Sequence, residues 1–574
     1  MVLIILSWLY ILFTTVNLGY ACTIALRIKI RELGTASFLG LFVTALIAGF
    51  WAVFGRINWE FHIFLLVLNL LLTVKFNIGI VALYKDFFRQ FKNLTLALKI
   101  LLPVVSLLIV AQCASAPFLP DNESYYIQTI KWLNEYGFVR GIANLHFFFA
   151  QVSGWHILQG VFSFSFLYRH FNDLSGFCLL LGNVFAFFRL EDYFKKGRRI
   201  DLVVGLLPVA NVLLFSFISS PSADLPIYVL TFLVFYIFML QYKKMSPAGF
   251  TILCLFVLFA MLIKVTALPL LILPILSYVR HYRKLHNINE ILIVSSLTLA
   301  LFLLKNSIVS GYAFYPLTSI GRLQVNFRVP MAIVNFYTDF AKHEIFMLSE
   351  QQYRAADGWS LFVRWLHLPK LDGLFNMLAM VLTVFTPVLI YRYFNKQKFW
   401  VLYLTMVLGM VFFYCTSPQY RFFLNFILFF SFLWATVLLS NRKVVLSLLW
   451  IATFVTAALL FVPIGLGRFT SNKQLLSGSR FEVSYLVFPH SNSKSGTAFE
   501  TIENGNLKYY SPIENGFFWG NGDGDLPCLN KVQVDYFQDY YHYRPQRRGN
   551  SLNDGFYSQP VLNDSLQILI RSRN

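Results

Sequence analysis

The stretch LKILLPVVSLLIVAQCASA (98–116), followed at once by PFLPDNESYYIQTIKWLNEYGFVRGIANLH (117–146), decides the fold of this chain. The first part is apolar over the roughly 20 residues that a helix needs to cross a bilayer. The second part opens with Asp121 and Glu123, within a turn of the expected end of that helix. Carboxylates at a membrane rim are costly and usually functional. The sequence therefore predicts a spanning helix that carries two acidic residues to the membrane surface.

The composition extends this reading to most of the chain. Hydrophobic residues make up 57% and charged residues 13% of the 574 positions, far more apolar than a soluble domain needs. We therefore expect an all-α polytopic membrane protein with about 14 transmembrane helices. The apolar runs are 2–21, 36–55, 61–83, 98–116, 172–190, 201–219, 224–242, 248–263, 266–280, 288–306, 373–391, 398–415, 421–439 and 443–463.

The basic residues predict the orientation. Seven windows between predicted spans together hold 22 Lys and Arg residues against five Asp and Glu residues. By the positive-inside rule these windows are cytoplasmic, so the intervening loops and the C-terminal tail are expected outside. The net charge of +20 is then an orientation signal and not a nucleic-acid footprint. The windows are 22–35, 84–99, 189–200, 241–246, 280–290, 391–399 and 440–444.

Three parts follow from this layout. Residues 1–97 form N-terminal transmembrane helices, and residues 98–463 form a transmembrane core with outer loops 117–171 and 307–372. Residues 464–574 are polar and form an extracytoplasmic domain. Its runs FEVSYLVF (481–488) and KVQVDYFQDYYHY (531–543) predict strands, so this domain is expected to be α+β or β-rich.

The first outer loop is expected to carry structure of its own. The segment SYYIQTIKWLNEYG (124–137) predicts an amphipathic helix lying on the outer leaflet, because Trp and Tyr favour the headgroup level. The next apolar segment, 147–168, predicts a re-entrant or interfacial element. A span there would invert every later loop.

Ionisable residues recur at the predicted outer ends of helices. They are Asp121, Glu123, Asp224 in SSPSADLP (219–226), Lys264 and Arg421. Carboxylates suit proton transfer, whereas Lys and Arg suit a lipid phosphate. Each also has a structural explanation. Either aspartate can cap a helix, and either cation can anchor a helix end at the interface.

Four strings carry a resemblance to a known group of enzymes: DNESYYIQTIKWLNEYGFVRGIANLH (121–146), SSPSADLP (219–226), SGYAFYP (310–316) and SPQYRF (417–422). Together they resemble a bacterial family of uncharacterised multi-spanning membrane proteins. The layout looks like the GT-C superfamily of membrane glycosyltransferases, which take a sugar from a polyprenyl phosphate or diphosphate. The match runs from about residue 100 to 430 and more weakly into the tail.

The resemblance implies roles for individual residues. Asp121 would be the general base that deprotonates the acceptor hydroxyl, with Glu123 assisting it or holding a divalent cation. Asp224 would orient the acceptor or a metal, and Lys264 and Arg421 would neutralise the departing lipid phosphate.

His146 and Tyr315 would be sugar contacts. The partners implied are membrane lipid, a polyprenyl-linked sugar donor and a glycan, lipid or protein acceptor. The location implied is the bacterial inner membrane.

Two other functions fit the same features. An O-antigen-type polymerase also combines many spans with large outer loops. A transporter or flippase of a lipid-linked anion is the third reading, although transporters place charges and broken helices near the bilayer midplane. A non-catalytic member of the fold is also compatible with the sequence.

Overall fold

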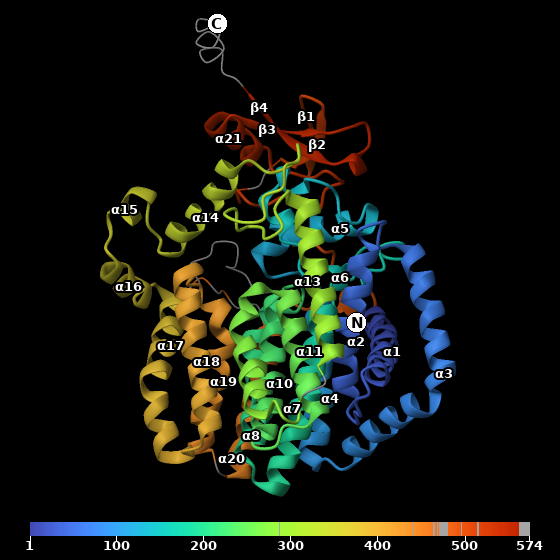
Figure 1. The fold of residues 1–574 in the computed structure, drawn as a ribbon, viewed down its shortest axis with the longest axis vertical. Coiled ribbons are helices and arrows are strands. Elements are labelled where there is room, and N and C mark those ends of the chain that lie inside the picture. Colours follow the sequence, from blue (N-terminus) through green and yellow to red (C-terminus); the bar gives the residue numbers. More distant parts are fainter. Residues whose placement is uncertain are drawn as a thin grey trace, which may run out of the picture.

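Long apolar sequences form long helices that run side by side through most of the molecule (Figure 1). This computed structural model describes residues 1–285, 288–439, 441–462, 465, 467, 469, 480–494, 496–513 and 516–561. Within them, twelve helical segments are long and apolar enough to cross a membrane. They are α1 (Val2–Ala25), α2 (Leu33–Trp51), α3 (Trp59–Lys92), α4 (Leu96–Ala114), α7 (Leu174–Lys196), a broken segment Arg199–Phe217, α10 (Asp224–Gln241), α13 (Asn289–Ser310), α17 (Lys370–Leu389) with η7 (Ile390–Phe394), α18 (Gln397–Thr416), α19 (Tyr420–Leu438) and α20 (Arg442–Phe461).

The broken segment is a chain of short turns: α8 (Arg199–Gly205), η4 (Leu207–Ala210), α9 (Asn211–Leu214) and η5 (Phe215–Phe217). The other two predicted spans are shorter apolar helices, as their length suggested. They are α11 (Pro247–Ile263) and η6 (Val265–Leu271) continuing into α12 (Ile272–His281). Together these elements cover all fourteen predicted runs.

Two helices at the edge of the bundle show what surrounds it. In α3 and α13 only 17% of the most apolar window is buried inside the protein. On α3, Val74 and Ile78 are 79% and 85% exposed. Such continuous exposed apolar surface is suited to lipid and not to water. The fold is therefore that of a multi-pass membrane protein.

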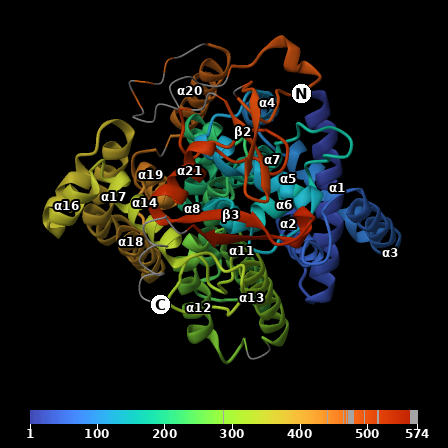
Figure 2. The ribbon, with the colours of Figure 1, turned by 90° about the horizontal axis from the view of Figure 1, so that it is seen from above.

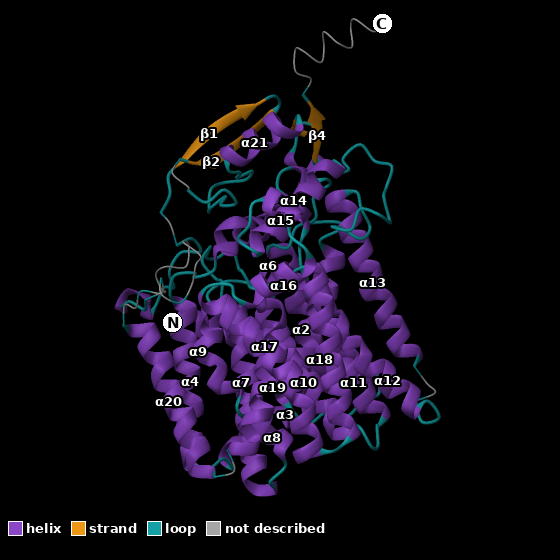
Figure 3. Cartoon of the chain, turned by 90° about the vertical axis from the view of Figure 1, so that its left-hand side faces the viewer, coloured by secondary structure: helices purple, strands orange, loops and turns teal. Residues whose placement is uncertain are grey.

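The outer loops and the tail lie at one end of the bundle (Figure 3). Seen from above, the tail covers the middle of the bundle, whereas α3 and α16 lie at opposite edges (Figure 2). The N-terminus is at the same end, where the Met1 amine donates to the Tyr485 carbonyl oxygen at 2.5 Å. The loop elements are η1 (Asn122–Tyr126), α5 (Ile127–Glu135), η2 (Ile142–Asn144), η3 (Phe147–Ala150), α6 (Gly154–Val161), α14 (Met331–Ile345), α15 (Glu350–Ala355) and α16 (Gly358–Leu366).

The predicted surface helix is enclosed instead of lying on lipid. In α5 the side chains of Trp132 and Leu133 are buried. On the side toward the tail, Gln128 donates to the carbonyls of Gly522 and Gly524, both at 3.0 Å. The helix is thus held between the bundle and the tail, and the prediction of an outer-leaflet position is wrong. The following segment does stop short of spanning, since α6 has only 8 residues.

The tail is a small α+β unit whose strands lie elsewhere than predicted. Two antiparallel pairs form, β1 (Phe499–Asn504) with β2 (Leu507–Pro512) and β3 (Tyr543–Arg547) with β4 (Phe556–Pro560). The run predicted as a strand at 531–543 is mostly the helix α21 (Lys531–Tyr541), and 481–488 contains only the turn η9 (Val483–Leu486). A short turn, η10 (Leu552–Asp554), precedes β4.

Local chemistry explains why α21 is a helix. Asn530 caps it by accepting from the backbone N–H of Val532 at 3.0 Å. Val534 and Phe537, three positions apart, are then buried together on one face. The alternation of apolar and polar residues at its start is too short to outweigh these signals.

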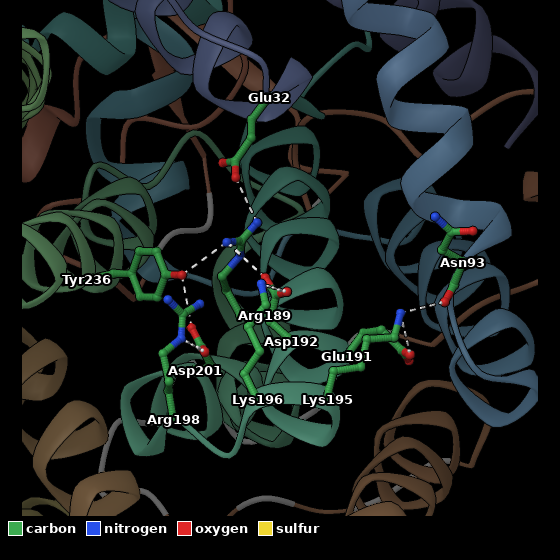
Figure 4. Close-up of polar contacts among 10 residues, drawn as sticks. All are labelled: Glu32, Asn93, Arg189, Glu191, Asp192, Lys195, Lys196, Arg198, Asp201 and Tyr236. Carbon is green, nitrogen blue, oxygen red and sulfur yellow. Dashed lines mark hydrogen bonds and ion pairs between the residues drawn. The ribbon is translucent and has the colours of Figure 1, made fainter.

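Residues of three predicted cytoplasmic windows, 22–35, 84–99 and 189–200, meet in one group of polar contacts (Figure 4). The group lies near α8, at the end of the bundle away from the tail (Figure 1). Arg189 of α7, whose side chain is 11% exposed, pairs with Glu32 at 2.7 Å and with Asp192 at 3.1 Å. It also donates to the Tyr236 hydroxyl at 3.0 Å, which in turn donates to Asp201 at 2.9 Å. Charged residues from separate loops therefore tie the helices together at this end.

Candidate functional site

An ion pair joins the first outer loop to the start of α19. Arg421 Nη1 donates to Asp121 Oδ2 at 2.7 Å, across 300 positions of sequence. Arg421 Nε donates to Gln419 Oε1 at 2.8 Å, which fixes the plane of the guanidinium. The Arg421 and Asp121 side chains are 32% and 25% exposed, so a ligand can reach the pair. Asp121 makes no capping hydrogen bond, so capping does not account for it.

A second ion pair lies at the start of α10. Asp224 is the first residue of this helix, and its side chain is only 6% exposed. The Lys264 ammonium donates to Asp224 Oδ1. Lys264 has extended backbone geometry between α11 and η6, with φ −154° and ψ 125°, where the regular helix stops. It therefore meets a carboxylate, and snorkelling to the interface does not explain its position.

The ring of Phe422 connects the two pairs. Lys264 Nζ lies 4.0 Å from the ring centroid, and the guanidinium carbon of Arg421 lies 5.2 Å from it. Both distances are within the range of a cation–π interaction. The Tyr228 hydroxyl donates to the Arg421 carbonyl oxygen at 2.6 Å and so fixes the start of α19 against α10. Four of the seven predicted site residues are thus brought together.

Two tyrosines complete this group, and sequence reasoning missed them. Burial raises the pKa of Tyr125 and Tyr126, and the nearby Asp121 and Asp224 carboxylates raise it further while Arg421 opposes them. Their hydroxyls therefore stay protonated at neutral pH. The signal was present in the sequence, because this pair of tyrosines directly follows the acidic residues.

Glu123 points away from the ion pairs and holds the tail. Its carboxylate accepts from the Ser493 hydroxyl and from the Lys494 backbone N–H, each at 2.8 Å. Its backbone carbonyl accepts from the N–H groups of Asn521 and Gly522. Burial raises the pKa of Glu123, with the hydrogen bonds from residues 493 and 494 acting in the opposite direction. The contacts make it a docking residue for the tail.

His146 and Tyr315 belong to a separate aromatic cluster under the tail. The Tyr315 hydroxyl donates to the Phe147 carbonyl at 3.1 Å, and His146 Nδ1 accepts from the Phe148 N–H at 3.3 Å. Burial lowers the pKa of His146 to about 3, so the ring is neutral. The structure places these two residues beside Phe147 and not at the ion pairs.

The resemblance leaves the metal open, with Glu123 or Asp224 able to hold a divalent cation. Within the part of the chain that the structure describes, no three His, Cys, Asp or Glu residues gather as a cation site. The six cysteines, all in described segments, are free thiols, and the Cys528 Sγ donates to the Asn521 carbonyl at 3.0 Å.

These features define a polytopic helical membrane protein with a charged site beneath a small α+β cap. The chain belongs to a family described as a domain of unknown function (DUF8201), whose model matches residues 1–428. That match includes all seven predicted site residues and ends before the tail. No curated protein and no solved structure matches the chain.

Proposed function

We propose that this protein is a membrane glycosyltransferase. It would move a sugar from a polyprenyl phosphate or diphosphate donor to a glycan, lipid or protein acceptor on the outer face. The observation that carries the proposal is the meeting of two carboxylates and two cations at Phe422. Carboxylates can take the proton of an acceptor hydroxyl, and Arg and Lys can bind a phosphate.

The proposed reaction is a displacement at the anomeric carbon. Asp121 accepts the proton of the acceptor hydroxyl as the acceptor oxygen bonds to that carbon. The bond between the carbon and the phosphate oxygen breaks, and the lipid phosphate leaves with the electron pair. Asp224 orients Lys264 and the acceptor, and its oxygens are of the type that a divalent cation prefers.

Arg421 and Lys264 have N–H groups that their ion pairs do not use, and these can donate to the departing phosphate. A guanidinium has five N–H groups, and Arg421 gives one to Asp121 and one to Gln419. Lys264 gives one of its three to Asp224. The side chains of Arg421 and Asp121 are partly exposed, which supports access of the lipid phosphate to this ion pair.

The test uses the purified full chain in detergent, given polyprenyl-phosphate and polyprenyl-diphosphate sugars with a panel of acceptors. We expect sugar transfer, and Asp121→Asn should reduce it by about 10²–10⁴-fold, the usual contribution of a general base. Asp86→Asn is the matched control, since Asp86 pairs with Arg89 at the other end of the protein. Wild-type rates in Asp121→Asn would refute the assigned role.

The same assay separates the competing functions. Transfer in detergent needs no sealed membrane, so it rules out a pure transporter or flippase. A ladder of products from one acceptor would indicate an O-antigen-type polymerase. An EDTA arm tests the divalent cation, because metal-dependent transfer stops on chelation and recovers when the cation is restored.

A further inference from the structure

Lys305 of α13 is a cation without a carboxylate partner among the described residues. Its ammonium donates to the Val152 carbonyl, in the loop before α6, and lies 5.5 Å from the centroid of the Phe302 ring. The two ion pairs at Phe422 cancel in charge. Lys305 therefore carries a positive charge that no carboxylate of the described residues neutralises through an ion pair. A half-buried, uncompensated charge is costly, and an anionic ligand would remove that cost.

His156 is a second group with an unused donor. Ser153 caps α6 and donates its backbone N–H to His156 Nδ1 at 3.3 Å. A neutral imidazole whose Nδ1 accepts carries its proton on Nε2. The residue is 1% exposed, and within the described residues Nε2 completes no hydrogen bond. Buried donors are normally satisfied, so this one calls for a ligand or a water.

The charged groups around His156 connect it to the ion pairs. Burial lowers the pKa of His156 to about 3, and the ammonium groups of Lys305 and Lys264 lower it further. The Asp121 carboxylate and the Gln151 backbone act in the opposite direction. His156 is therefore neutral. Gly154, two residues before it, packs against the backbone of Leu262, which is two residues before Lys264. Its ring packs against Tyr125 and Tyr126, at centroid distances of 5.8 and 4.9 Å.

We infer that Lys305 and the Nε2–H of His156 form a second phosphate subsite beside Lys264, so that the lipid-linked substrate carries a diphosphate. This inference rests on the proposed function, which left the number of phosphates open. One phosphate would bind Arg421 and Lys264, and the other would bind Lys305 and His156. A monophosphate would leave the charge of Lys305 uncompensated.

The first test compares ligands on the purified full chain in detergent, with farnesyl phosphate and farnesyl diphosphate as probes. We expect the diphosphate to bind at least about tenfold more tightly, the gain from one charge-assisted hydrogen bond. Equal affinities would overturn the second subsite. Inorganic diphosphate and phosphatidylglycerol micelles identify the source of the anion. If either binds as tightly as farnesyl diphosphate, the assignment to a lipid diphosphate is wrong.

The second test uses matched lysine variants. Lys305→Met should abolish the preference for diphosphate and leave farnesyl phosphate binding unchanged. Lys75→Met is the control, because Lys75 is also in a membrane helix beside a phenylalanine, 5.3 Å from the Phe76 ring centroid. It should keep the preference. An unchanged preference in Lys305→Met, or its loss in the control as well, would refute the subsite.

A histidine variant gives an independent reading if Lys305→Met does not fold. His156→Phe keeps an aromatic ring and removes the donor, so it should lower diphosphate affinity severalfold with little change for the monophosphate. Equal losses for both ligands would overturn the role of Nε2. Binding needs no sugar transfer, so a diphosphate preference without transferase activity would sink the proposed function and retain the subsite.

Discussion

Phe422 lies between two cations that each have a carboxylate of their own. The ring is apolar and contacts both cations through its π face, without hydrogen-bonding to either pair. The arrangement lets each cation hold its aspartate in position. The proposed catalysis would use the same atoms as the ion pairs, so each variant at this site has to be measured for both stability and activity.

A charge swap separates these two roles at the scale of the residue. Asp121→Arg and Arg421→Asp each leave two like charges together, and we expect each to lower the free energy of unfolding by about 1 kcal/mol, since the pair is partly exposed. The double swap should recover most of that loss without recovering sugar transfer, because the base has moved to α19. Thermal unfolding and transfer assays on all four proteins measure this. Recovery of activity in the double swap would contradict the role of Asp121.

Glu123 predicts a pH dependence for docking of the tail. Burial raises its pKa in the folded protein above the ordinary value of 4.5. The stabilisation from this group is therefore complete below about pH 4.5 and is lost as the pH rises through the folded value. Tryptic release of the tail should become faster over that range in the wild type. Glu123→Gln should remove the dependence, and an identical pH profile in both proteins would contradict it.

At the scale of the element, Arg189 of α7 should contribute more to the free energy of unfolding than an exposed arginine does. Arg189→Met removes the ion-pair partner of Glu32 and leaves Asp192 paired with Lys196 alone, and we expect the free energy of unfolding to fall by about 2 kcal/mol. Among the described residues Arg89 pairs only with Asp86, and its side chain is 70% exposed, so Arg89→Met should change the free energy of unfolding by less than about 1 kcal/mol. Detergent-based thermal unfolding compares the two. Equal losses would contradict this prediction.

The spanning helices were predictable because length and apolarity alone determine them. Every apolar run is helical, although the run 201–219 is broken into short helical turns and the run 266–280 begins with the 3-10 segment η6. The positions of the strands in the tail were not predictable in the same way. At 531–543, the capping by Asn530 and the burial of Phe537 outweighed a weak alternating pattern.

For the site, the sequence identified the ionisable residues but not their pairing. Asp121 and Arg421 are 300 positions apart, and only the packing of the bundle brings them together. Glu123 is adjacent to the site in sequence and yet turns toward the tail. Neighbouring carboxylates in a sequence cannot reveal which partner each will face.

At the scale of the whole molecule, the basic windows and the tail lie at opposite ends of the bundle (Figure 1). The positive-inside rule then predicts that the tail lies outside the cytoplasm. Alkaline phosphatase fused after Val561 should be active in bacterial cells, and green fluorescent protein at the same place should be dark. A fluorescent, phosphatase-negative result would reverse the orientation and remove an outer-face activity.

The hydrogen bonds between the tail and the segment after Asp121 have a consequence for biosynthesis. Glu123 is bonded to residues 493 and 494, and Asn122 to Asn492, some 370 positions later in the chain. The ribosome completes residues 492–494 long after it has made residues 122 and 123. A prematurely terminated polypeptide would lack these hydrogen bonds, so the segment after Asp121 would reach its final position only once the whole chain has been made.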